Sequence, residues 1–87
     1  MTFKYVLIRE QGEPFAVVLV QRKIVENQAV AEQAIDWFQS RHFHVPTGLL
    51  SRDEFGAPME YYGRVDLAVR LSRLPLDSLT WNEVKVS

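Results

Sequence analysis

The sequence predicts an α+β fold: a two-layer sandwich in which two helices pack on one face of a mostly antiparallel or mixed sheet. Two observations lead to this prediction. Short runs rich in aromatic and β-branched residues are interspersed with two segments whose apolar residues recur at helical spacing. Glycine and proline residues separate neighbouring runs, as hairpin turns require. The predicted order is β-β-α-β-β-α-β, in a single domain that spans residues 1–87.

The first two runs predict a β-hairpin. Residues 3–9 are rich in aromatic and β-branched side chains, residues 15–20 are almost wholly apolar, and residues 11–14 supply the turn. Because residues 15–20 are apolar on both faces of the pleat, we expect the second strand to lie inside the sheet rather than at its edge.

The most regular helical pattern begins after Asn27, which is a suitable N-cap residue. Arg41 and His42 lie near its end, where cations interact favourably with the helix dipole. The residues of the apolar stripe share one face at helical spacing: Val30, Ala31, Ala34, Ile35 and Phe38.

The second half of the chain predicts another hairpin, from residues 45–52 and 57–62. Gly63 ends its second strand, and apolar residues then recur at helical spacing until Pro75 stops the helix. Residues 81–86 alternate in polarity and predict a last strand.

With both helices on one face, the other face of the sheet would be uncovered. It would carry Tyr5, Met59, Tyr61 and Trp81, or their neighbours along each strand, and exposed aromatic residues of this kind mark association surfaces. The alternative is that half of these aromatic side chains belong to the core.

The composition and charge exclude several classes of protein. Of 87 residues, 47% are hydrophobic, which is enough for a folded domain, yet there is no cysteine to provide disulfides or thiolate metal ligands. A domain this small that lacks disulfides can gain stability by self-association, which we therefore expect. The net charge is -1 with the two signs interspersed, and the longest apolar run is only residues 15–20. We therefore expect a cytoplasmic protein that contacts neither nucleic acid nor membrane.

Motifs for catalysis are lacking in the sequence. Its four glycines stand in separate turns and form no phosphate-binding loop, and neither a nucleophile elbow nor a cysteine nucleophile occurs. His42 and His44 would share one side of an extended chain, and Asp53 could add a third metal ligand, but a solvated or helix-capping histidine pair is the simpler interpretation. The sequence favours a non-enzyme without deciding the point, and it predicts no catalytic residue, metal or cofactor.

Four consecutive residues are the candidate ligand-binding site: Tyr61, Tyr62, Gly63 and Arg64. Two aromatic residues end a strand, Gly63 allows a direct turn into a helix, and Arg64 stands beside the helix N-terminus, where a carboxylate or phosphate could bind. The alternative is that Gly63 only makes a tight turn and that Arg64 pairs with a neighbouring carboxylate.

Nearly the whole chain resembles short uncharacterised bacterial proteins, some of them carried on mobile gene cassettes of integrons. The resemblance rests on residues 10–12, the Val45-Pro46 step, residues 61–66 and residues 75–81. It implies a compact bacterial domain and carries no assigned activity.

A second, local resemblance covers residues 45–74, which are similar to the C-terminal half of thioredoxin-like domains. It rests on Val45-Pro46-Thr47 before an apolar strand and on Gly63 at the start of a helix. The redox cysteines are missing, and a hairpin replaces the N-terminal strand-helix-strand unit. The resemblance implies a cis peptide bond before Pro46.

These observations favour a non-catalytic assembly or partner-binding domain that forms a homo-oligomer. The alternative is a protein that binds a small anionic ligand at Gly63 and Arg64. An enzyme that uses His42 or His44 with a carboxylate has only residue types in its favour.

Overall fold

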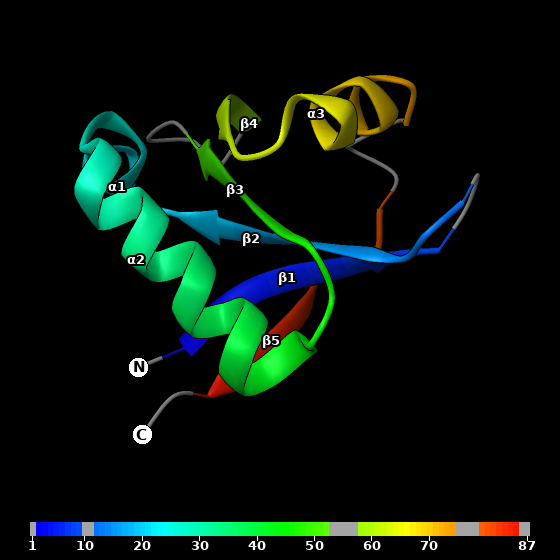
Figure 1. Cartoon of the computed structure of the whole chain (residues 1–87), viewed down its shortest axis with the longest axis horizontal. Helices are drawn as coiled ribbons and strands as arrows, with labels where there is room; N and C mark the ends of the chain where they lie inside the picture. Colours follow the sequence, from blue (N-terminus) through cyan, green and yellow to red (C-terminus); the bar gives the residue numbers. More distant parts are fainter. Residues whose placement is uncertain (1, 10–11, 53–57, 75–78, 86–87) are drawn as a thin grey trace.

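The computed structural model of the chain describes residues 2–9, 12–52, 58–74 and 79–85 (Figure 1). Within them, one five-stranded mixed sheet carries three α-helices and a π-helical turn, so the predicted α+β class is confirmed. The strands are β1 (Thr2–Ile8), β2 (Phe15–Val20), β3 (Thr47–Arg52), β4 (Pro58–Tyr62) and β5 (Asn82–Lys85). The helices are α1 (Arg22–Glu26), α2 (Gln28–Phe38) and α3 (Val65–Ser72), and the π-helical turn η1 is Gln39–Phe43.

The strands lie in the order β4-β3-β2-β1-β5. Only β2 and β3 run parallel, because the helical segment from α1 to η1 connects them and carries the chain back to the same end of the sheet. The other three pairs are antiparallel. β2 is the central strand and all six of its residues are buried, which confirms the interior position predicted from its apolar run.

The helices cover both faces of the sheet, and this differs from the prediction that both helices share one face. Alternate residues of β2 enter two separate cores. Val18 and Val20 pack with Ala31 and Phe38 of α2, while Phe15, Val17 and Leu19 pack with Leu67 and Leu71 of α3. We call these surfaces the α2 face and the α3 face of the sheet (Figure 1). The physical reason lies in β2: a strand that is apolar on both faces needs cover on both.

The predicted uncovered aromatic face is absent from the described structure. Tyr5 packs on the α2 face, with its ring centroid 4.8 Å from that of Phe43. Tyr61 and Trp81 pack against the core of the α3 face instead. The side chain of Met59 lies outside the described part. The alternative interpretation, in which these aromatic residues contribute to the core, therefore holds for Tyr5, Tyr61 and Trp81.

The helical segment after β2 differs from the prediction at both ends. α1 was not expected, because five residues are too few to show a helical period. Asn27 caps α2 as predicted, since its side chain accepts a hydrogen bond from the backbone N–H of Val30 at 3.2 Å. α2 continues into η1, which ends at His44 in the left-handed conformation with φ 55°.

A side chain at this helix end fixes the start of β3. The Gln39 Oε1 atom accepts a hydrogen bond from the backbone N–H of Thr47 at 3.2 Å. The peptide bond before Pro46 is trans, since no cis bond occurs among the described residues. The cis bond implied by the resemblance to thioredoxin-like domains is therefore wrong.

The position of α3 leads to a first prediction. Leu71 is buried in the core of the α3 face, whereas Val69 on the same helix is 47% exposed. Leu71→Ala should lower the free energy of unfolding by about 2–5 kcal/mol, because it leaves a cavity between helix and sheet. At protein concentrations at which the chain is monomeric, Val69→Ala should change the free energy of unfolding by no more than about 0.5 kcal/mol. Urea denaturation of both variants checks this, and equal effects would contradict the assigned face.

Candidate functional site

The strand-to-helix turn between β4 and α3 is built around the ring of Tyr61. Tyr61 lies opposite Leu50 of β3, and its ring crosses the backbone of Gly48 and Gly63. A Cβ atom would lie 2.5 Å from the Tyr61 hydroxyl oxygen at Gly48 and 2.6 Å from it at Gly63. The hydroxyl donates a hydrogen bond to the backbone carbonyl of Arg64 at 3.3 Å. Two glycines therefore make room for one tyrosine, which holds the turn in place.

The two glycines contribute in different ways. Gly63 has φ 154°, in the positive region that favours glycine, so it serves both the turn and the close approach of the ring. Gly48 lies within β3 and is needed only for space. Because neither glycine carries a side chain, the Tyr61 ring can lie over the backbone at these two positions instead of facing solvent.

Desolvation of the Tyr61 hydroxyl raises its pKa to about 12, and the nearby Asp66 carboxylate adds to this effect. The positive charge of Arg64 acts in the opposite direction and is the smaller influence. The phenol therefore stays protonated and remains a hydrogen-bond donor throughout the physiological range.

Arg64 is bound to Asp66 by two hydrogen bonds, from Nε to Oδ1 at 3.1 Å and from Nη2 to Oδ2 at 2.7 Å. This pair of hydrogen bonds lowers the pKa of Asp66 and raises the pKa of Arg64. The charge of Glu13 also raises the pKa of Arg64. Both side chains are exposed, so the pair is screened by solvent. An anion at this turn would have to compete with Asp66 for the guanidinium group.

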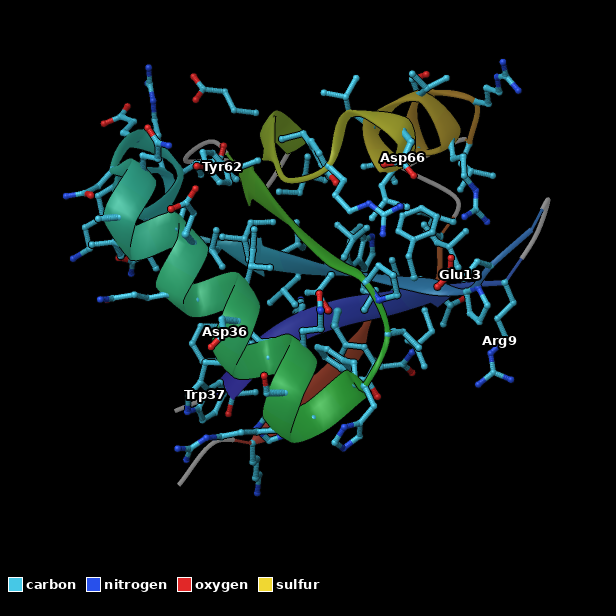
Figure 2. All side chains as sticks on the ribbon, in the orientation of Figure 1. Arg9, Glu13, Asp36, Trp37, Tyr62 and Asp66 are labelled. Atoms are coloured by element: carbon cyan, nitrogen blue, oxygen red, sulfur yellow. The ribbon has the colours of Figure 1, made fainter. Side chains whose placement is uncertain are left out.

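Tyr62 does not join the other three predicted residues. It points to the α2 face, where its hydroxyl donates to the Glu32 carboxylate at 3.4 Å. Desolvation and the Glu32 charge raise its pKa. Figure 2 shows Tyr62 beside the first helices and Asp66 on α3, in separate parts of the molecule. The structure thus groups Tyr61, Gly63 and Arg64 and separates Tyr62, and anion binding at the turn stays a prediction.

The sequence pattern places Arg70 on the solvated side of its helix, but in the structure Arg70 joins α3 to the beginning of β2. Its guanidinium carbon lies 4.7 Å from the centroid of the Phe15 ring, and Nη1 donates to the backbone carbonyl of Glu13 at 2.7 Å. The two partners of this hydrogen bond are 57 positions apart in the chain. A local pattern carries no signal for such a contact.

The two histidines do not form the extended pair that a metal site would need. His42 lies in η1, with its ring centroid 4.7 Å from that of Trp37, which Figure 2 labels on α2. His44 ends the helical segment, and its backbone N–H donates to the carbonyl of Gln39. Asp53 lies outside the described residues. No group of three histidine or acidic side chains in the described ranges could hold a metal ion.

The comparisons with known proteins found no match to a family model, to a curated protein or to a solved structure. None of the helices in the described part of the chain is long and apolar enough to cross a membrane. The fold and the turn thus define a mixed-sheet α+β protein with helices on both faces, and its function has to be inferred from its own side chains.

The contact between Gly48 and Tyr61 gives a second prediction. Gly48→Ala should destabilise the protein by about 1–3 kcal/mol, because the new methyl group overlaps the tyrosine ring. In a Tyr61→Leu background the same change should cost clearly less, since the ring has gone. A double-mutant cycle of denaturation midpoints measures this coupling. Additive effects of the two substitutions would show that the overlap is relieved elsewhere.

The raised pKa of Tyr61 gives a third prediction. The folded state holds the phenolic proton more tightly than the unfolded chain does. The protonated hydroxyl therefore contributes its full stabilisation below pH 10, and this contribution is lost as the pH rises through about 12. Tyr61→Phe should therefore lose less stability than the parent protein between these limits. Thermal unfolding at a series of alkaline pH values tests this. Parallel losses in the two proteins would be the contrary result.

Proposed function

We propose that the chain is a non-catalytic assembly domain that forms homo-oligomers through the outer surface of α3. One observation supports this most directly. Val65 is 79% exposed and Val69 is 47% exposed, one helical turn apart, on the side of α3 that faces away from the sheet. Exposed β-branched residues contribute little to helix stability, so an apolar ridge here is better explained by a partner that covers it.

The charges along α3 favour a second copy of the chain as that partner. Asp66 lies in the first turn of the helix and Arg73 directly after its last turn, and both are exposed. Two such helices packed antiparallel about a two-fold axis would bring Val65 and Val69 of one copy against the same residues of the other. Each Asp66 would then lie near the Arg73 of the second copy, as an isologous interface requires.

The interface has to extend beyond the helix itself. A stable protein interface buries roughly 800 Å² on each partner, more than two valines can supply. Polar residues beside the ridge, including Arg64 and Ser72, are exposed and would form its rim. Valine in the centre and charged residues around it are the usual arrangement of such a surface.

The proposal predicts an oligomer that specific substitutions dissociate. Val65→Glu combined with Val69→Glu should raise the dissociation constant by about 100-fold or more, because each valine loses its burial and each carboxylate would be desolvated. Glutamate is compatible with a helix, so the fold should persist. Native mass spectrometry and light scattering at micromolar concentration measure the subunit number.

Val30→Glu is the matched control, because Val30 is 41% exposed on α2 and lies away from α3. It should leave the oligomer intact. A parent protein that stays monomeric on concentration, or a Val30→Glu variant that dissociates as readily as the double variant, would refute assembly through α3.

A further inference from the structure

The sheet divides at one end, where β1 and β2 separate. Their described pairing ends at Lys4 opposite Leu19. Beyond this point Phe3 continues in register with Val84 of β5, whereas Val20 continues in register with Ser51 of β3. The two central strands thus follow different neighbours, and a gap opens between the start of β1 and the end of β2.

A cleft of about 540 Å³ occupies this gap. Residues from both diverging strands, from α1 and from β5 line it, and its apolar part includes Leu19, Val20 and Ile24. Clefts of 300–1,000 Å³ are the usual size for small-molecule sites. The carboxyl end of β2, which runs parallel to β3, opens into this cleft.

The charged side chains at the cleft favour an anion. Lys4 of β1 and Lys23 of α1 line it, together with the single carboxylate of Glu83 on β5. No ion pair involves any of the three within the described residues. Glu83 is the residue opposite Lys4 in the pairing of β1 and β5, so the two lysines and this carboxylate leave the cleft with one net positive charge. A net positive charge beside an apolar wall suits a molecule with one negative group and one apolar part.

We propose that this cleft binds a small organic carboxylate with an aliphatic body. The carboxylate lies between Lys4 and Lys23, and the aliphatic part packs against Leu19, Val20 and Ile24. Glu83 opposes binding of the carboxylate and thereby limits its affinity. None of the residues that line the cleft belongs to α3, so this site is independent of the proposed assembly surface.

The test is a titration of the full chain with sodium octanoate, followed by the chemical shifts of backbone amides. Saturable shifts are expected at the start of β1, the end of β2 and α1. Octylammonium at the same concentrations has the same apolar body with the opposite charge, and should not produce them. These two probes separate recognition of the carboxylate from simple attraction of an aliphatic chain.

Three variants test the role of each charge. Lys4→Ala with Lys23→Ala should weaken octanoate binding about fivefold or more, since exposed ion pairs contribute modestly. Glu83→Gln should strengthen it about twofold, which a general loss of folding cannot mimic. Lys85→Ala is the control, because Lys85 is exposed on β5 and does not line the cleft. It should leave the affinity within about a factor of two.

The proposal is overturned by any of three results. Octanoate could give no saturable shift at the cleft, or octylammonium could bind there equally well. Alternatively, Lys85→Ala could weaken octanoate binding as much as the double lysine variant does. Binding would then depend on the net charge of the chain and not on Lys4 and Lys23. Confinement of the shifts to the cleft, with opposite effects of the lysine and glutamate substitutions, establishes the site.

Discussion

Burial of β2 on both of its faces is the constraint on which the rest of the structure depends. All six of its side chains are buried, so neither face of the sheet's centre can be left to solvent. The chain meets this demand by connecting β2 to β3 through helices on one face and by placing α3 on the other.

The attachment of α3 illustrates how a short helix is held without a long apolar stripe. Leu67 and Leu71 anchor it to the sheet, Tyr61 fixes its beginning through Gly48 and Gly63, and Arg70 reaches the Phe15 ring and the carbonyl of Glu13. All of these contacts are made on the side of α3 that faces the sheet. Val65 and Val69 on the outer side take no part in these contacts and stay exposed.

The cleft and the outer surface of α3 are both surfaces that no further helix or strand of the described chain covers. Leu19 belongs both to the core beneath α3 and to the wall of the cleft, which opens beside Lys4, where β1 and β2 diverge. Since the cleft uses no residue of α3, a ligand there would leave the helix accessible. The proposed association surface and the proposed ligand site therefore share no lining residue.

Local patterns in the sequence determined the α+β class, the interior position of β2, the Asn27 cap and the approximate limits of the two longer helices, because spacing and capping act between near neighbours. Only the tertiary structure decided which face α3 covers, that Tyr62 turns away from Tyr61, and that Arg70 joins Glu13 and Phe15. The same holds for the gap between β1 and β2. The physical reason is that these features depend on strand order and on contacts between residues far apart in the chain, for which a local pattern contains no signal.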